Sequence, residues 1–286
     1  MTARIPATSA NLGPGFDSLA LALDLCNEIT IDTEGPADVT WEGEGADSLP
    51  RDGSDLVNAA FRSVFAVAER PAPEISLLGV NRIPVTRGLG SSAAAVVGGV
   101  ALGFAALGWE HDPHRMESFT NPFESHHDNV AAALHGGLTV AYAADGGWSA
   151  ERLEPHPELR PVLLVPEVEL STTLARDALP AQVELTDATF NIGRTALAVL
   201  ALTRDPGLLP VALEDRLHQR VRLDLVPEVR DAFERLRSGG IPLCVSGAGP
   251  SLLAFESDEH PVQAPDGGWR ALRLKVRARG VEVASA

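Results

Sequence analysis

The segment from residue 85 to 99 reads V-T-R-G-L-G-S-S-A-A-A-V-V-G-G, and it constrains the fold more than any other stretch. Gly88 and Gly90 tolerate positive φ and carry no Cβ, so the chain can turn tightly there and a ligand can approach the backbone. The alanines that follow Ser92 are strong helix formers, which predicts a helix beginning at or near Ser91. The first amides of such a helix lack internal acceptors and lie at the positive end of its dipole.

Two interpretations of this loop are open on the local pattern alone. The loop could be a turn before a serine-capped helix that packs in the core. It could instead be a phosphate cradle, because glycine-rich loops and helix N-termini bind anions through their amides. The G-x-x-x-x-G-K-[ST] pattern of Walker-type NTPases does not occur, and the single lysine, Lys275, lies far from the loop.

Composition narrows the class of protein. A chain of 286 residues is long enough for two lobes. Its net charge of -16 argues against nucleic acid and against an anionic membrane surface as partners. The two cysteines, Cys26 and Cys244, are too few for a disulfide framework, and no apolar run is long enough for a membrane span. We therefore expect a cytoplasmic globular protein, which must concentrate positive potential locally if it binds a nucleotide.

The hydrophobic pattern mixes strands and helices without a steady β-α-β alternation, which predicts α+β layers. Strands are expected at 3–5, 19–31, 74–80, 138–142, 160–165 and 251–255, with 38–43 as a hairpin partner and 7–15 as a loop. Helices are expected at 55–68, 92–107, 111–119, 128–134, 190–202 and 229–238. The segments 269–276 and 281–283 are expected to complete the last sheet. We expect an N-terminal lobe at 1–150 and a C-terminal lobe at 151–286.

Three Gly/Ser-rich segments lie far apart in the sequence. They are P-A-T-S-A-N-L-G-P-G-F-D-S at 6–18, the loop 88–92, and S-G-A-G-P-S at 246–251. In this order they resemble the signature of the galactokinase, homoserine kinase, mevalonate kinase and phosphomevalonate kinase (GHMP) superfamily. The first segment is most similar to that of the homoserine kinases. The resemblance covers nearly the whole chain and implies a two-lobed fold, with a ribosomal-protein-S5-like N-terminal lobe and a ferredoxin-like C-terminal lobe.

The resemblance also implies an activity. It is the ATP-dependent phosphorylation of the side-chain hydroxyl of L-homoserine to O-phospho-L-homoserine, a step of threonine biosynthesis, with Mg²⁺ as cofactor and a homodimer as the assembly. Phosphoryl transfer needs positioning and charge neutralisation more than covalent help. The resemblance further implies direct transfer without a dedicated general base. Two alternatives are a catalytically silent relative that senses an amino acid or nucleotide, and a kinase for another small alcohol such as mevalonate.

The resemblance assigns residues to each ligand. The nucleotide residues are Pro84, Arg87, Gly88, Leu89, Gly90, Ser91, Ser92 and Ala93, with Asp55 near the adenine. The homoserine residues are Asn11, Asp17, Asn129, Arg176, Arg222, Gly247 and Gly249. A carboxylate suits the substrate ammonium, a guanidinium suits its carboxylate, and the Asn129 amide would hydrogen-bond the acceptor hydroxyl. A loop cap for Asp17, surface ion pairs for the arginines and a simple turn at 247–249 are the structural alternatives.

One stretch departs from the pattern of the homoserine kinases. These enzymes usually carry two carboxylates flanking one residue before Gly-His-Pro-Asp-Asn, whereas this chain has N-P-F-E-S-H-H-D-N at 121–129. The first acidic position falls on Pro122, so Ser92 and Glu124 remain as the expected Mg²⁺ ligands and, with Asn129, as the catalytic residues. Glu117 is an alternative ligand, and a weakened metal site is another. His126 and His127 with Asp128 are interpreted as a solvent-exposed pair rather than a metal cluster.

Overall fold

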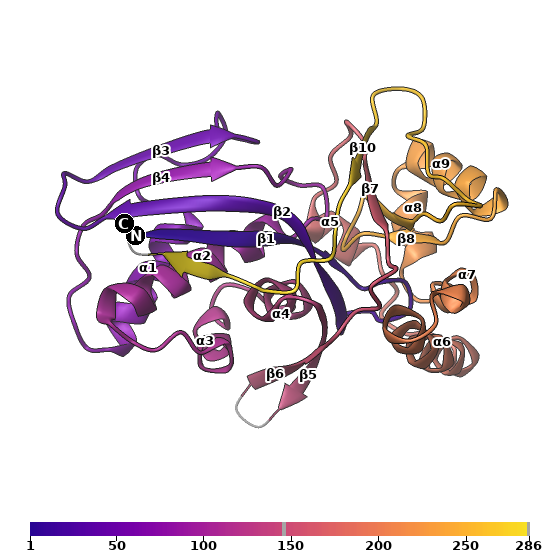
Figure 1. Ribbon diagram of the computed structural model, residues 1–286, viewed down its shortest axis with the longest axis horizontal. Coiled ribbons are helices and arrows are strands. Elements are labelled where there is room, and N and C mark those ends of the chain that lie inside the picture. Colours follow the sequence, from indigo (N-terminus) through magenta and orange to yellow (C-terminus); the bar gives the residue numbers. More distant parts are fainter. Residues whose placement is uncertain (145–146, 285–286) are drawn as a thin grey trace.

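The computed structural model describes residues 1–144 and 147–284, and their strands form two sheets that lie side by side (Figure 1). The larger sheet contains β1 (Thr2–Ala10), β2 (Leu19–Asp32), β3 (Asp38–Gly43), β4 (Ser76–Asn81), β5 (Leu138–Ala144), β6 (Gly147–Leu153) and β11 (Glu282–Ala284). The smaller sheet runs in the order β10 (Arg270–Arg273), β7 (Pro161–Val165), β9 (Leu252–Phe255) and β8 (Leu243–Val245). The α+β fold class is therefore confirmed.

The helices cover these sheets. In chain order they are α1 (Leu56–Val67), α2 (Ser91–Leu107), α3 (Pro113–Thr120), α4 (Asp128–His135), α5 (Thr172–Asp177), α6 (Leu185–Thr203), the 3-10 turn η1 (Pro206–Leu208), α7 (Leu209–Ala212), α8 (Gln219–Asp224) and α9 (Pro227–Ser238). The helix predicted to begin near Ser91 does begin at that residue. Among the described residues, no helix has the length and hydropathy to cross a bilayer.

Strand β1 is longer than the sequence pattern predicts. The pattern ended the strand near Pro6 and placed a loop at 7–15, whereas β1 continues to Ala10 in antiparallel pairing with β2. The register of this pair shifts between Pro6 and Ala7, and such an irregularity lets a strand tolerate proline, which has no amide to donate. As a result, Thr8 and Ser9 are buried residues of the sheet rather than loop residues.

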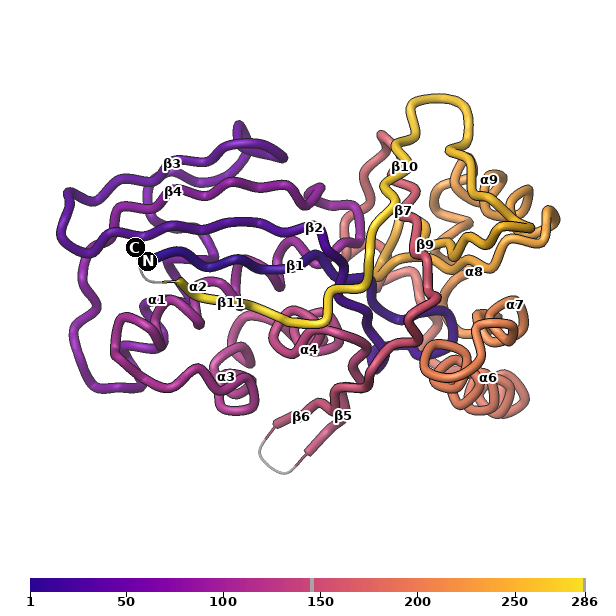
Figure 2. Tube along the Cα trace, viewed as in Figure 1, coloured from indigo at the N-terminus to yellow at the C-terminus, as the bar shows by residue number. Residues whose placement is uncertain are grey.

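Two pairings also differ from expectation. Strand β3 pairs in parallel with β4, not as a hairpin partner of β2. The last strand, expected in the second sheet, pairs antiparallel with β1 in the first, so the C-terminal segment returns beside the N-terminus (Figure 2). The expected lobe boundary at 150 falls within β6. Strand β11, which lies in the expected C-terminal lobe, belongs to the same sheet as β1. Long-range pairing of this kind has no local sequence signal because the partners are separated by most of the chain.

Helix α2 is almost entirely buried and packs against α1 through its small residues. A Cβ added at Gly99 would collide with the backbone carbonyl oxygen of Val57 in α1 and would lie 2.8 Å from the Cβ of Ala60. The neighbour is backbone and cannot rotate away, so the close approach of the two helices depends on glycine at this position.

We predict that Gly99→Ala destabilises the protein by about 1–3 kcal/mol through overpacking, although alanine is the better helix former. Gly193 in α6 is the matched control, because it has a negative φ and nothing lies within 4 Å of an added Cβ. Gly193→Ala should instead stabilise the protein by up to about 1 kcal/mol. Urea unfolding of the three proteins measures both effects, and equal shifts for the two variants would contradict this account of the α1–α2 contact.

Candidate active site

A cleft of about 210 Å³ opens at the N-terminus of α2 and gathers residues from segments distant in sequence. Its predicted lining residues are Asn11, Asp17, Pro84, Arg87, Gly88, Leu89, Gly90, Ser91, Ser92, Ala93, Glu124, Asn129, Arg176, Arg222 and Gly247. Two predicted residues do not line it: Gly249, and Asp55, which lines a neighbouring hollow. The cleft also takes in residues that the sequence analysis did not assign to a ligand, above all His126 and Asp128.

The glycine-rich loop presents a helix terminus to this cleft. Gly88 and Gly90 both adopt φ of +70°, and the loop is held by hydrogen bonds from Ser246 Oγ to the Gly88 carbonyl (2.8 Å) and from the Thr8 amide to the Leu89 carbonyl (3.1 Å). Gly90 is the N-cap residue of α2, and no side chain caps the helix. The serine-capped core helix is therefore not what forms. The first amides of α2 remain available to an anion at the positive end of the helix dipole.

A second hollow of about 340 Å³ adjoins the cleft and shares Ser91 and Ser92 with it. Its wall is mostly apolar and includes Trp41, Leu49, Pro50, Leu56 and Val57. Such a slot beside an anion cradle has the chemistry to hold a flat heterocycle. Asp55 lies at its edge, where its carboxylate caps α1 by accepting from the Asn58 amide at 3.0 Å. The sequence pointed only to Asp55, because the apolar residues read as ordinary core residues.

Ser92 and Glu124 meet at the mouth of the cleft. The Ser92 hydroxyl donates to Glu124 Oε1 at 2.5 Å, and burial raises the pKa of the Glu124 carboxyl above its ordinary value. Both groups offer the hard oxygen donors that Mg²⁺ prefers, so this donor set fits the ion. Pro122 is exposed, and the Glu117 carboxylate is engaged elsewhere, 2.7 Å from His135 Nε2. Of the three positions considered from sequence, only Glu124 places a carboxylate in the cleft.

The first turn of α4 supplies an amide and a buried carboxyl. The side-chain oxygen of Asn129 accepts from the Thr8 hydroxyl at 2.7 Å, which fixes the orientation of its amide beside Gly90. Asp128 accepts from the Asn129 backbone amide at 2.8 Å. Burial raises the pKa of Asp128 to about 7, far above its ordinary 3.8. A carboxyl of this kind gains stability as an anion once a cation binds beside it.

Opposite charges face each other on the far wall of the cleft. Arg176 makes a two-pronged contact with the Asp17 carboxylate, with N–O distances of 2.9 and 2.7 Å, and His126 Nδ1 lies 3.6 Å from the same carboxylate. Asp17 has a φ of +54° in a loop that Asn11 stabilises, since the Asn11 side chain accepts from the Asp17 amide and donates to the Gly247 carbonyl. Strained backbone at non-glycine residues is typical of functional loops.

Arg222 is buried and carries an unpaired donor. Its guanidinium donates to the Gly247 carbonyl at 2.8 Å and to His218 Nδ1 at 3.1 Å, and it lies over the ring of Phe16. Its Nε atom is buried without a hydrogen-bond partner in the described residues. Burying a charged group with an unpaired N–H costs free energy unless an anion accepts a hydrogen bond from it. This cost favours a carboxylate or phosphate ligand beside Arg222.

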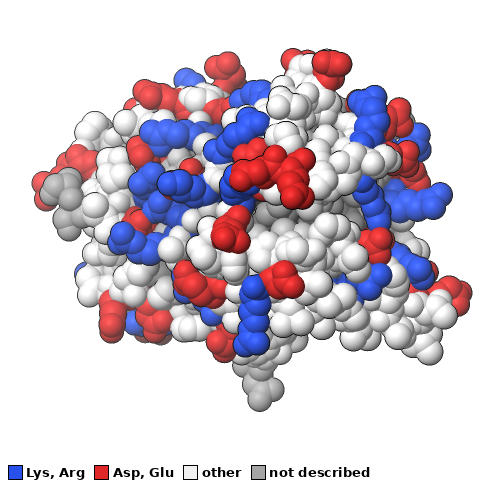
Figure 3. Space-filling model, turned by 45° about the vertical axis from the view of Figure 1, so that its right-hand side comes forward, with Lys and Arg blue, Asp and Glu red and all other residues white. Residues whose placement is uncertain are grey.

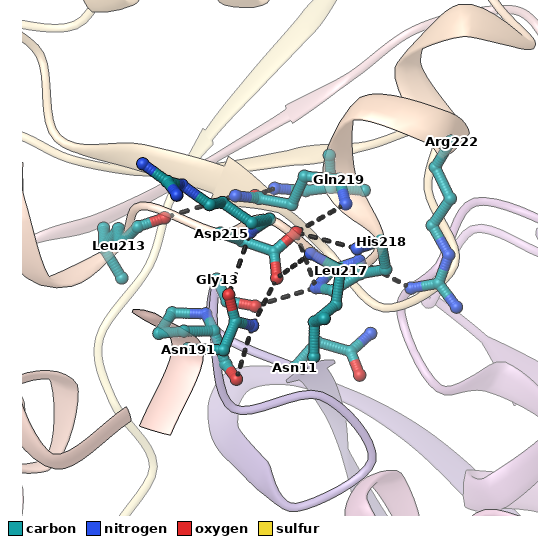
Figure 4. Close-up of polar contacts among 12 residues, drawn as sticks. Asn11, Gly13, Asn191, Leu213, Asp215, Leu217, His218, Gln219 and Arg222 are labelled. Atoms are coloured by element: carbon teal, nitrogen blue, oxygen red, sulfur yellow. Dashed lines mark hydrogen bonds and ion pairs between the residues drawn. The ribbon is translucent and has the colours of Figure 1, made fainter. Parts of the chain in front are cut away.

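A buried network around Asp215 holds Arg222 in place (Figure 4). The Asp215 carboxylate accepts from the backbone amides of His218 and Gln219 at 2.9 and 2.7 Å, and from the Asn191 side chain at 2.7 Å. His218 Nε2 lies 2.7 Å from the Gly13 carbonyl and can only donate to it, so Nδ1 accepts from Arg222. Burial lowers the pKa of His218 to about 4, which keeps this imidazole neutral.

The structure corrects the interpretation of the two histidines and adds a second contact for Arg87. His126 and His127 are not a solvent-exposed pair: both are partly buried, His126 faces Asp17, and the His127 ring stacks on Trp148 at 4.6 Å. Arg87 lines the cleft, but its guanidinium donates to the carbonyls of Pro166 and Glu167 at 3.1 and 2.6 Å. Its charge thus joins the loop to the segment that follows β7 in the second sheet.

Basic and acidic side chains are interspersed over the face drawn in Figure 3. The cleft is also mixed in charge, since Arg87, Arg176 and Arg222 line it together with Asp17, Glu124 and Asp128. The donors left for an anion are therefore the first amides of α2 and the buried Arg222.

Comparison with known proteins agrees with this geometry. The GHMP kinases N terminal domain matches residues 55–137, and the GHMP kinases C terminal domain matches residues 197–266. A homoserine kinase of Clavibacter michiganensis subsp. michiganensis is 43% identical over 98% of this chain and 92% of its own length. The homoserine kinase of Moorella thermoacetica is 42% identical over 92% of this chain and 89% of its own length.

Solved structures extend the comparison. The crystal structure of homoserine kinase from Cytophaga hutchinsonii superimposes with a TM-score of 0.87 at 25% identity, covering 99% of this chain and 97% of the other. A mevalonate kinase structure shares the fold at 12% identity, with a TM-score of 0.68 over 98% of this chain and 100% of the other. The chain therefore belongs to the GHMP kinases, and within them to the homoserine kinase family.

Proposed function

We propose that this chain transfers the γ-phosphoryl group of ATP to the side-chain hydroxyl of L-homoserine and forms O-phospho-L-homoserine, a step of threonine biosynthesis. One observation carries the proposal: a single cleft joins the uncapped N-terminus of α2 to a wall of opposite charges, formed by Asp17, Arg176 and Arg222. The helix terminus suits a phosphate chain, and the charged wall suits the ammonium and carboxylate of an amino acid.

In this proposal the ammonium and carboxylate of the substrate replace the contact between Asp17 and Arg176. Asp17 and Arg176 neutralise each other in the absence of ligand. An amino acid that inserts between them gives its ammonium to Asp17 and Asp128, and its carboxylate to Arg176 and Arg222. Both charges remain paired, so binding does not leave a buried charge uncompensated. The substrate hydroxyl then points toward Asn129, beside the glycine-rich loop.

The chain contributes to the reaction by binding and alignment. The loop amides and the first turn of α2 hold the triphosphate, and the apolar hollow with Trp41 holds the adenine. Asn129 orients the acceptor hydroxyl, and its neutral amide cannot remove the proton. In the direct transfer that we infer, the hydroxyl oxygen bonds to the γ-phosphorus as the bond to ADP breaks, and the hydroxyl proton passes to an oxygen of the transferred group. Ser92 and Glu124 would hold Mg²⁺, which when bound supplies charge neutralisation on the phosphates.

The proposal extends to assembly and location. We infer a homodimer and a cytoplasmic location, as the resemblance to homoserine kinases first suggested. Helix α6 exposes Leu185 and Ile192, which are 81% and 73% accessible, and a second copy of the chain would cover such side chains. Both cysteines are buried and unpaired, which is compatible with a reducing compartment.

An assay of ADP release with homoserine, serine, threonine and mevalonate tests the activity directly. With Mg²⁺ and ATP present, we predict turnover with homoserine and a lower kcat/KM for each of the other three alcohols. No turnover at millimolar homoserine would contradict the proposal. Thermal stabilisation by homoserine or ATP without turnover would identify the protein as a sensor instead.

The role of Glu124 has its own test. We predict that Glu124→Gln raises the Mg²⁺ concentration needed for half-maximal activity by at least about tenfold, the range seen even for partners that only support a metal ligand. Glu110→Gln, at an exposed position outside the cleft, is the control and should leave the Mg²⁺ titration unchanged. An unchanged titration in Glu124→Gln would remove this residue from the metal site.

The raised pKa of Asp128 predicts two pH effects. Asp128 is protonated in the folded free protein below about pH 7 but ionises near its ordinary 3.8 when unfolded, so the folded state loses stability as pH rises through this window. His218, with a folded pKa of about 4, works in the opposite direction between pH 4 and 6.5. The contribution of His218 is the same in the parent and in Asp128→Asn, so it cancels when the two proteins are compared. Because the variant lacks the Asp128 ionisation, its free energy of unfolding should rise relative to that of the parent as pH rises from about 5 to 8.

Homoserine binding should follow the same ionisation. The substrate ammonium favours the anionic form of Asp128. In the parent, KM for homoserine should therefore fall as pH rises toward 7, by up to about tenfold per pH unit. The Asp128→Asn profile should be flatter over this range, whereas Asp177→Asn at an exposed position should retain the parent profile. Parallel KM profiles for the parent and Asp128→Asn would contradict the assignment of the ammonium to Asp128.

A further inference from the structure

Three metal-ligating side chains converge outside the cleft, on the facing sides of α3 and α4. His114 and Glu117 are one helical turn apart in α3, and His135 is the last residue of α4. Glu117 Oε1 lies 2.7 Å from His135 Nε2 and 3.3 Å from His114 Nδ1. One ligand atom from each of the three residues lies within 4.8 Å of the other two.

We propose that His114, Glu117 and His135 form a binding site for a divalent transition metal of the zinc class. Two imidazoles and one carboxylate are a typical donor set for Zn²⁺ or Co²⁺, and they leave a fourth position for water. Tetrahedral metal–ligand bonds of about 2.0–2.1 Å place neighbouring ligand atoms roughly 3.3 Å apart. The observed separations, 2.7 and 3.3 Å from Glu117 to the two histidines and at most 4.8 Å within the set, bracket that spacing.

The burial of the three residues suits a bound ion. The Glu117 and His135 side chains are only 5% and 7% accessible, whereas His114 is 60% accessible and lies at the outer side. His135 also lines a surface cavity of about 810 Å³ together with His111, and this cavity gives solvent access to the site. Within the described residues, these two histidines are the only basic side chains within 4 Å of the Glu117 carboxylate, and no arginine or lysine lies that close.

The position of the site gives the metal a consequence for the cleft. Segment 121–127 connects α3 to α4 and carries both Glu124 and His126. A metal held by both helices would restrain the relative positions of the two helices that this segment joins. The proposed ion is separate from the Mg²⁺ position at Ser92 and Glu124, because Glu117 does not line the cleft and Glu124 is not in the cluster.

Titration of the untagged, metal-free protein with Co²⁺ tests the proposal, because Co²⁺ bound by imidazole and carboxylate has visible absorption bands that report its coordination. We expect one Co²⁺ per chain with a tetrahedral spectrum, displaced by an equivalent of Zn²⁺. His114→Ala, whose side chain is largely exposed, should fold normally and weaken Co²⁺ binding by at least about tenfold. Glu117→Gln should weaken it as well.

Two controls separate this site from others. His111→Ala removes a histidine of the same cavity that is not part of the cluster, and it should retain the parent affinity and spectrum. Glu124→Gln should also retain them, since the cleft is a different site. An unchanged Co²⁺ titration in His114→Ala, or no tetrahedral band in the parent, would overturn the proposal and leave the cluster as a hydrogen-bonded carboxylate between two histidines.

Discussion

The uncapped N-terminus of α2 is the constraint on which the rest of the site depends. A long buried helix with unpaired first amides is stable only where its packing against other elements stabilises it and an anion can accept hydrogen bonds from those amides. The packing comes from α1 and the large sheet, against which α2 buries its small residues. The loop before it is fixed from both sheets, through Thr8 of β1 and Ser246, which follows β8. The geometry of the phosphate cradle is therefore a product of the whole core.

The site also depends on how the chain orients the positive charge of Arg222. A chain with a net charge of -16 must still hold two anionic groups of its ligands, the triphosphate and a carboxylate. Arg222, which we propose binds the carboxylate, is buried among groups that orient it without neutralising it: a neutral His218, a backbone carbonyl at Gly247 and an aromatic ring. Asp215 acts one step further back, where it fixes His218 through backbone amides. Within the described residues Arg222 thus keeps a buried donor that is not satisfied internally, and our proposal assigns it to a ligand.

Local sequence patterns predicted most elements of the fold, whereas the residues of the site were assigned from the resemblance to the GHMP kinases, and their roles stay predictions. The helix at Ser91, the three Gly/Ser-rich segments and the residues Asn11, Asp17, Arg176 and Arg222 lie around one cleft, to which only the folded chain brings them. Asp128 was seen only as a neighbour of two histidines, because burial, which raises its pKa, depends on the packing of α4. The apolar hollow with Trp41 was not foreseen, since apolar residues give no sign of facing a cavity rather than a core.

The sequence by itself determined the chemistry that is available: a glycine-rich turn into a helix, carboxylates and arginines for a zwitterion, and a proline where a second acidic residue was expected. Only the tertiary structure decided which of these groups meet. It placed Glu117 beside His135 and Glu124 beside Ser92, stacked the His127 ring on Trp148, and paired the last strand with β1. The physical reason is that conformational preference acts over a few residues, whereas burial, charge pairing and strand pairing are settled between segments that only the folded chain brings together.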